Sequence, residues 1–145
     1  MVQYMTDLTA AIGLVQMKRY PAMLARRRQL IEHYDDTLSG LNLQVRDHYT
    51  GEHTSSGHLY QVRLLGHDSA YRNDVITEMA RRDVACNVHF KPLPMLTAYK
   101  SLCFDINDYP NAFHQFENEI TLPLHTRLTD EEVEYILENF KDIIG

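Results

Sequence analysis

The sequence predicts a small α+β domain in which a long first helix and later helices cover one face of a short, mainly antiparallel β-sheet. Segments with apolar residues at helical spacing alternate with segments whose apolar residues stand at every second position. The last segment also carries a complete helix-start signal. With 145 residues, 44% of them hydrophobic, the chain can bury one core, so residues 1–145 are expected to form a single domain.

A long helix, from about residue 7 to residue 39, is expected to open the domain. Thr6 suits its N-cap and Gly40 suits its C-terminal stop. Pro21 lacks a backbone donor, so the helix is expected to kink or restart there. If it is continuous, it would be about 50 Å long, and a helix of that reach usually bridges two domains or two subunits.

The strands are predicted from alternation of apolar and polar residues. The clearest is the segment 58–65, where Tyr60, Val62 and Leu64 share one face. A polar loop, 47–57, precedes it. The other expected strands are 41–45, 84–89 and a brief one at 120–122.

The remaining helices follow from capping signals and spacing. A helix over about 71–82 should turn Val75, Ile76, Met79 and Ala80 inward. Short helical turns are expected near 95–99 and after Asn111 as a cap, with loop between them. The final helix follows Thr129, which forms a capping box with Glu132, and Leu128 and Val133 stand where a hydrophobic staple forms.

Composition excludes several classes of partner. A net charge of −6 disfavours nucleic acid, because phosphate binding requires a basic surface. The basic run Arg26-Arg27-Arg28 is expected to be the solvated face of the first helix. No apolar run is long enough for a membrane helix, and the residues after Met1 are polar, without a secretory signal. Cys86 and Cys103 are therefore expected to be reduced thiols in a cytoplasmic protein.

Four segments follow one another along nearly the whole chain, namely 5–14, 58–60, 88–93 with Tyr99 downstream, and 122–124 with 128–133. Together they resemble the DegT/DnrJ/StrS-type sugar aminotransferases. The resemblance departs from the family at the start, because family members place Asn, an aromatic residue and often Arg where this chain has Val2, Gln3 and Tyr4. No cofactor residue is therefore carried over from that segment.

The resemblance implies the small C-terminal domain of the aspartate-aminotransferase (type I PLP) fold. In this family a larger N-terminal domain carries the lysine that binds pyridoxal phosphate (PLP), and the enzymes are dimers. They transfer an amino group, usually from glutamate, to a nucleotide-linked keto sugar for surface polysaccharides or deoxyaminosugars. The resemblance thus implies PLP in the full-length protein and none bound to this chain, which should be inactive alone. It also implies a nucleotide-sugar substrate and a homodimer.

His89, Phe90 and Lys91 form the best candidate site for binding substrate. They end an expected strand and precede a rigid loop that contains two prolines, and ligands commonly bind at such strand ends. His and Lys can donate to phosphate, and an aromatic ring can stack on a base or sugar. In the family the matching segment contributes to the nucleotide-sugar pocket. The alternative is a partly buried histidine beside a surface lysine.

No catalytic residue or metal site is expected in the chain. Of its four lysines only Lys91 stands beside other candidate groups, and neither a glycine-rich phosphate loop nor an acid for the pyridine nitrogen is evident. His48, His53 and His58 lack the spacing of a zinc site, so the first two are expected in a solvated loop. His58 is expected to begin the strand and to pack or hydrogen-bond inside, and Cys86 to be a small core thiol.

Two functions of other classes stay open. The long first helix could pair with itself, which would make the chain a non-catalytic dimerisation or interaction module. The chain could also be a complete small enzyme that uses His89 as general base, although no second catalytic group pairs with His89 in the sequence. A nucleotide sugar that raises the melting temperature would favour the aminotransferase.

Overall fold

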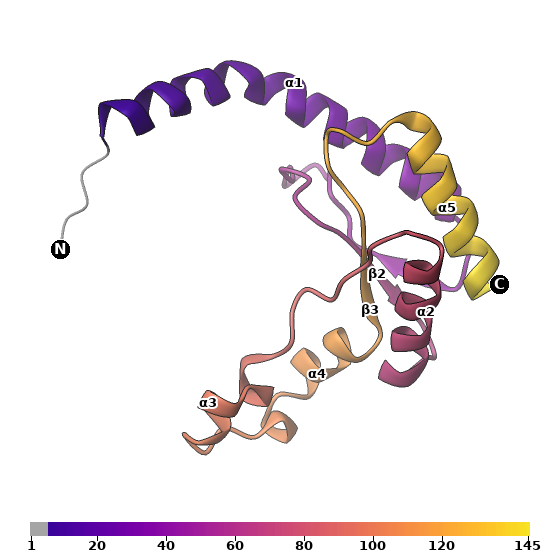
Figure 1. Cartoon of the computed structure of the whole chain (residues 1–145). Helices are drawn as coiled ribbons and strands as arrows, with labels where there is room; N and C mark the ends of the chain where they lie inside the picture. The colour runs from indigo at the N-terminus through magenta and orange to yellow at the C-terminus, as the bar shows by residue number, and fades with distance from the viewer. Residues whose placement is uncertain (1–5) are drawn as a thin grey trace.

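The computed structural model describes residues 6–145 and forms an α+β arrangement around a three-stranded sheet (Figure 1). The expectations for residues 1–5, including the departure at Val2, Gln3 and Tyr4, lie outside the described residues. The elements in order are α1 (Asp7–Leu38), β1 (Leu43–Val45), β2 (Tyr60–Leu64), α2 (Ser69–Arg81), η1 (Leu93–Met95), α3 (Thr97–Lys100), η2 (Ile106–Asp108), α4 (Pro110–Glu117), β3 (Glu119–Leu122) and α5 (Asp130–Ile144).

Helix α1 is continuous over 32 residues with Pro21 inside it, so the expected restart at Pro21 is wrong. Figure 1 shows one long arched helix. Pro21 lies on the exposed half of α1, where water can hydrate the Met17 carbonyl that loses its donor. At 1.5 Å per residue the helix is about 48 Å long. Its buried residues all lie near its C-terminal end and are Leu30, Ile31, Tyr34 and Leu38.

The sheet has the order β1-β2-β3, and both strand pairs are antiparallel, as expected. In its register Val62 lies between Val45 and Ile120, and Gln61 lies beside Thr121. The strand expected at 84–89 does not form as a full strand, so that prediction is wrong. This segment runs beside β3 but forms a single bridge, between Asn87 and Thr121.

The two faces of the sheet differ in chemistry. Tyr60, Val62 and Leu64 are at most 1% exposed and pack in one core with α1, α2 and α5. The opposite face carries polar residues at the alternate positions, among them Gln61 and Arg63. Arg63 donates to the His114 carbonyl of α4 and to Asn118, so α4 lies beside this polar face.

Helix α5 begins as the sequence predicts. Thr129 and Glu132 form a complete capping box, and Leu128 and Val133 are both buried. Arg26 of α1 donates to the Leu128 carbonyl at 2.8 Å and pairs with Asp130 at 2.7 Å. The expectation that the basic run of α1 is only a solvated face is therefore wrong for Arg26, which ties α1 to the start of α5.

Two further expectations, for the inward face of α2 and for the start of α4, need correction. Ala80 is exposed, whereas Val75 and Met79 are buried as expected, because α2 packs only one narrow stripe against the core. Tyr109, not Asn111, is the N-cap of α4, since the helix begins at Pro110. Within residues 6–145, no helix combines the length and hydropathy needed to cross a membrane.

Candidate functional site

The segment that carries His89, Phe90 and Lys91 is attached to the edge of β3. The backbones of Asn87 and Thr121 exchange two hydrogen bonds, of 2.7 and 3.2 Å. Gln61 of β2 donates its side-chain amide to the His89 carbonyl. The segment therefore lies on the polar side of the sheet, and two strands fix the position of His89.

His89 is half-buried and held at three atoms. Its backbone N–H donates to Glu119 Oε2 at 2.9 Å, and its ring Nδ1 lies 3.0 Å from Thr121 Oγ1. The ring meets the Phe90 ring edge to face, with 4.6 Å between centroids. Phe90 is 73% exposed and Lys91 is also exposed, so a fixed imidazole lies beside an open aromatic ring and an open cation.

Glu119 is a buried acid to which the His89 backbone and the Thr121 hydroxyl are hydrogen-bonded. It is 1% exposed, and burial raises the pKa of its carboxyl group. The hydrogen bonds from Thr121 and from the His89 backbone oppose that rise, as do the nearby His89 ring and the Arg72 guanidinium. Arg72 is itself buried and donates to the Glu119 carbonyl at 3.1 Å. A buried acid with all its acceptors engaged can hold its neighbours in a fixed geometry.

Sequence reasoning missed Gln61, Glu119 and Thr121 as members of this site. The alternation in 60–64 could have indicated Gln61, because a residue between two core positions faces the other side of the sheet. Glu119 and Thr121 lie 30 and 32 residues after His89, and no local pattern connects them to it.

A hollow of about 220 Å³ opens on the same polar face. Gln61 belongs both to this hollow and to the hydrogen bonds around His89. Arg46 and Arg63 also line it, which gives the face two cations suited to anionic groups. Its other lining residues are Gln44, Val45, Asp47 and Gln115.

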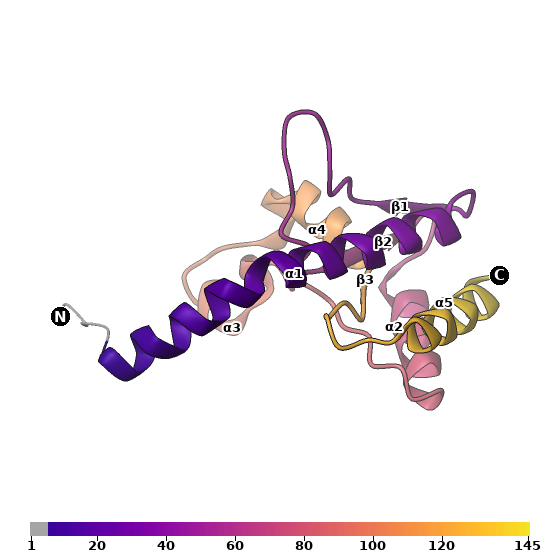
Figure 2. The same cartoon turned by 90° about the horizontal axis from the view of Figure 1, so that it is seen from above.

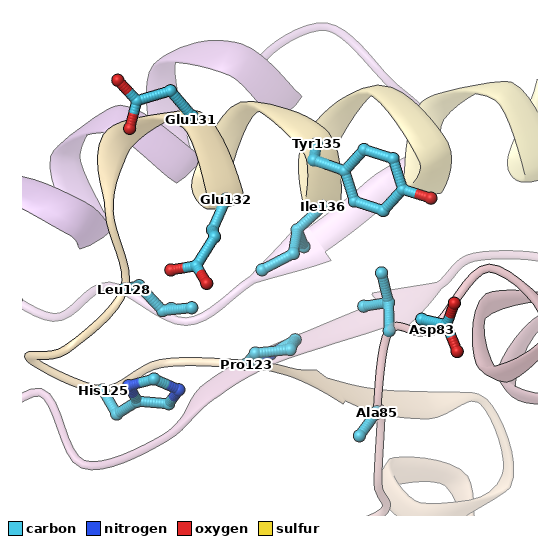
Figure 3. Close-up of a pocket in the computed structure, with 10 residues that line it drawn as sticks. Asp83, Ala85, Pro123, His125, Leu128, Glu131, Glu132, Tyr135 and Ile136 are labelled. Carbon is cyan, nitrogen blue, oxygen red and sulfur yellow. The ribbon is translucent and has the colours of Figure 1, made fainter.

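A larger pocket lies elsewhere, between α5 and the chain after α2 (Figure 3). Its volume is about 570 Å³, and neither His89, Phe90 nor Lys91 lines it. Of its ten lining residues none is Lys or Arg and three are acidic, so it repels a phosphate group. Glu132, which points inward in Figure 3, is also engaged in the capping box. The lining residues are Asp83, Val84, Ala85, Pro123, His125, Leu128, Glu131, Glu132, Tyr135 and Ile136.

The residues present do not fit PLP. All four lysines of the chain are exposed, and none forms an ion pair within residues 6–145. A Schiff-base lysine needs a depressed pKa, which burial or a neighbouring cation would provide. Lys91, the best placed, follows a histidine and an aromatic ring but is exposed rather than buried.

The histidines of the loop between β1 and β2 have structural roles. His48, expected in a solvated loop, is only 5% exposed and stacks on Tyr60 with 5.9 Å between ring centroids. Burial lowers its pKa. His53 Nδ1 lies 2.9 Å from Thr50 Oγ1 in the same loop, which extends away from the sheet in Figure 2. His58 is exposed and lies outside β2, so the expectation that it packs inside is wrong.

Metal and thiol chemistry find no support among the described residues. Between residues 6 and 145, no three His, Cys, Asp or Glu side chains gather in a way that could hold a metal ion. Cys86 packs against the core, as expected, and burial raises its pKa to about 12. A thiol with that pKa is not a nucleophile at neutral pH.

Known proteins similar to this chain are sugar aminotransferases and proteins of polysaccharide biosynthesis. "Putative sugar aminotransferase Spr1654" from Streptococcus pneumoniae, in its PMP form, is 51% identical, with a TM-score of 0.94 over 97% of this chain and 35% of that one. A dTDP-4-dehydro-2,3,6-trideoxy-D-glucose 4-aminotransferase from Saccharopolyspora spinosa is 29% identical over 95% of this chain. Spore coat polysaccharide biosynthesis protein SpsC from Bacillus subtilis is 27% identical over 97% of it.

The chain spans only 34% and 37% of the length of these two curated relatives. The S. pneumoniae protein has also been solved in a PLP form, with a TM-score of 0.92. The family model of the DegT/DnrJ/EryC1/StrS aminotransferases matches residues 2–141, which is nearly the whole chain. This chain therefore belongs to the DegT/DnrJ/EryC1/StrS aminotransferase family.

Proposed function

We propose that the chain is the small C-terminal domain of a PLP-dependent nucleotide-sugar aminotransferase with the aspartate-aminotransferase fold. Three relatives, of which this chain matches 34–37% of the length, support the division into a cofactor domain and this one. The substrate named for the S. spinosa relative is a dTDP-linked keto sugar, which supports a nucleotide sugar here. The amino donor is glutamate, and the pathway leads to a surface polysaccharide or a deoxyaminosugar.

The geometry of His89, Phe90 and Lys91 carries this proposal. His89 is immobilised by groups on two strands, whereas Phe90 and Lys91 extend from it into the open. An exposed aromatic ring can stack on a nucleobase, and a lysine can pair with a diphosphate. These three residues form one wall of the substrate pocket.

The cofactor and the catalytic lysine belong to the rest of the enzyme. This follows from the poor fit between PLP and the four exposed lysines of this chain. Alone, the chain is inactive as an aminotransferase. The unpaired thiols of Cys86 and Cys103 suit the cytoplasm, where nucleotide sugars are made and used.

Helix α1 supplies the contact to the rest of the enzyme and to a second subunit of a homodimer. Its first half exposes apolar side chains, and Leu8 is 75%, Ile12 57% and Val15 55% exposed. These three residues stand at helical spacing and form one stripe. Exposed apolar stripes of this kind mark protein contacts. The same stripe supports the second candidate function, a non-catalytic dimerisation module.

Thermal unfolding with added nucleotide sugar separates the two candidates. A ligand at about 100 times its Kd stabilises the folded state by about 2.7 kcal/mol, which raises the melting temperature by several degrees. We expect dTDP-glucose to raise it and the Phe90→Ala variant to lose the response. Lys141→Ala, which removes an exposed lysine of α5, is the matched control and keeps the response. A chain that dimerises but ignores every nucleotide sugar would support the interaction module instead.

A further inference from the structure

We propose that Glu119 and Thr121 are positioning residues that hold the His89 ring as the tautomer protonated on Nδ1, so that Nε2 presents a hydrogen-bond acceptor. The ligand group that His89 takes is then a hydrogen-bond donor, such as a sugar hydroxyl, rather than a phosphate oxygen. The role of His89 toward a ligand rests on the proposed function. The tautomer itself is a property of this chain and can be measured without a ligand.

The single hydroxyl hydrogen of Thr121 decides which nitrogen of His89 is protonated. Thr121 Oγ1 lies 2.5 Å from Glu119 Oε1 and donates to it. A threonine hydroxyl has one hydrogen to donate and two lone pairs that accept. Because that hydrogen is used toward Glu119, Thr121 Oγ1 can only accept from the His89 ring. Nδ1, 3.0 Å away, must therefore carry the proton.

The carboxylate of Glu119 receives the hydroxyl hydrogen of Thr121. Both of its oxygens accept, since Oε1 takes the Thr121 hydroxyl and Oε2 takes the His89 backbone N–H at 2.9 Å. Arg72, buried at 3% exposure, donates to the Glu119 carbonyl and adds a positive charge nearby. The hydrogen bonds from Thr121 and His89 and the charge of Arg72 oppose the rise that burial causes in the pKa of this carboxyl group. When the group is ionised, both oxygens accept and neither donates, so the chain of hydrogen bonds runs from His89 to Thr121 to Glu119.

Protonation of Nδ1 determines the state of Nε2, the other ring nitrogen of His89. A neutral imidazole carries one N–H, and the hydrogen bond at one nitrogen decides the state of the other. With the proton on Nδ1, Nε2 has a free lone pair. No group within residues 6–145 hydrogen-bonds to Nε2 in the structure, so this lone pair is available to a ligand.

Under this proposal His89, Phe90 and Lys91 each bind a different group of the ligand. The cation of Lys91 is the donor that suits a diphosphate, and the exposed ring of Phe90 suits a base. Under this proposal His89 binds a hydroxyl or amino group of the ligand rather than a phosphate oxygen. An acceptor at a fixed position discriminates between sugars that have or lack a donor there.

Long-range proton–nitrogen NMR of the ¹⁵N-labelled chain tests the tautomer directly. The His89 signals are identified by their loss in His89→Gln. Above the pH at which the ring becomes neutral, we expect Nδ1 to resonate as a protonated nitrogen and Nε2 as an unprotonated one. The reverse pattern in the wild-type chain would overturn the proposal.

Three variants separate positioning from mere packing. Thr121→Ser keeps the hydroxyl and should keep the Nδ1–H tautomer, whereas Thr121→Val removes the hydroxyl and should lose the preference. In Glu119→Gln the side chain has a single carbonyl oxygen, which must accept the His89 backbone N–H. The amide nitrogen then donates to Thr121 Oγ1, and the Thr121 hydroxyl donates to Nδ1 of His89. The Nε2–H tautomer should then dominate. An unchanged tautomer in both Thr121→Val and Glu119→Gln would refute the relay, that is, the chain of hydrogen bonds from His89 through Thr121 to Glu119.

The two proposals fail separately in these measurements. If the tautomer is as expected but nucleotide sugars do not change the melting temperature, the relay holds and the proposed function fails. If nucleotide sugars bind but His89 carries its proton on Nε2, the relay fails and the proposed function stands. A variant that does not fold leaves the wild-type tautomer as the deciding observation.

Discussion

The phenolic oxygen of Tyr60 donates a 2.7 Å hydrogen bond to Asp35 Oδ1, which joins the middle strand of the sheet to α1. Tyr60 is fully buried, and the edge of the Tyr34 ring meets its ring with 4.8 Å between centroids. His48 stacks on Tyr60 as well. One buried ring therefore connects β2, α1 and the loop that follows β1.

Replacement of Tyr60 by Phe should destabilise the chain by about 1–3 kcal/mol, because the half-buried Asp35 carboxylate loses its donor. The measurement is the free energy of unfolding from urea titration, with the slope unchanged. Tyr20→Phe, on the exposed half of α1, removes an equivalent hydroxyl and should change stability by less than about 0.5 kcal/mol. Equal losses in the two variants would contradict the role of the Tyr60 hydroxyl.

Asp35→Asn should become more stable relative to wild type as the pH rises. Burial raises the pKa of the Asp35 carboxyl, and the Tyr60 hydrogen bond and the charge of His48 only oppose that rise. The folded chain thus holds this proton more tightly than the unfolded chain. The stability linked to Asp35 is fully present below about pH 3.9 and is lost as the pH rises through the folded-state pKa.

Asn keeps an acceptor for Tyr60 and does not titrate, so this loss should be absent in Asp35→Asn. Urea titrations at several pH values between about 3 and 7 measure the difference. The exposed neighbour Asp36→Asn is the control for removal of one negative charge. A stability difference between Asp35→Asn and wild type that falls with rising pH would show that the sign is wrong.

Arg72→Met should cost about 2–4 kcal/mol of stability. The guanidinium is 3% exposed, lies over the Phe116 ring at 5.0 Å, and donates to the carbonyls of Phe116 and Glu119. Without it these two carbonyls lose a charged donor. Arg72→Lys should recover only part of the loss, because an ammonium cannot reproduce the planar fork of donors.

The control for Arg72 lies on the same helix. Arg81 is exposed, and among residues 6–145 it pairs only with Glu78, three residues before it. Arg81→Met should therefore cost less than about 0.5 kcal/mol. A comparable loss in Arg81→Met and Arg72→Met, measured by urea titration, would mean that helix propensity rather than the buried contacts sets the effect.

Gly57→Ala should destabilise the chain by about 2–4 kcal/mol, for two reasons. Its φ of +62° is costly for any residue with a Cβ, and that Cβ would lie 2.9 Å from Ile31 Cδ1. Gly66→Ala separates the reasons, because Gly66 has a φ of +80° and an open surrounding. It should cost only about 1–2 kcal/mol, and a melting curve for each variant shows whether the difference exists.

The isolated chain should form no stoichiometric adduct with PLP. Its lysines are exposed and charged, so the internal Schiff base has no site. Incubation with PLP, reduction with borohydride and intact-mass measurement test this directly. A single adduct that disappears in Lys91→Arg but persists in Lys18→Arg would show that the cofactor site lies in this chain after all.

The elements with local signals were predictable from the sequence. Alternation of Tyr60, Val62 and Leu64 gave the buried face of β2, and the capping box at Thr129 gave the start of α5, because both depend on residues within a few positions of each other. Pro21 led to a wrong prediction of a restart in the first helix. The cost of a proline in a helix depends on whether water reaches the carbonyl that loses its donor, and this depends on how exposed the helix is at that point.

By itself the sequence determined the class of fold and most of its elements, though not the absence of a full strand at 84–89, and it indicated His89, Phe90 and Lys91 as candidate residues. The resemblance along the chain also indicated the family, and the comparisons confirm it. Only the tertiary structure decided what surrounds His89. The edge of β3 brings Glu119 and Thr121 to its ring and backbone across about 30 residues of chain. Contacts over that separation follow from how strands pair and pack, and no local periodicity records them.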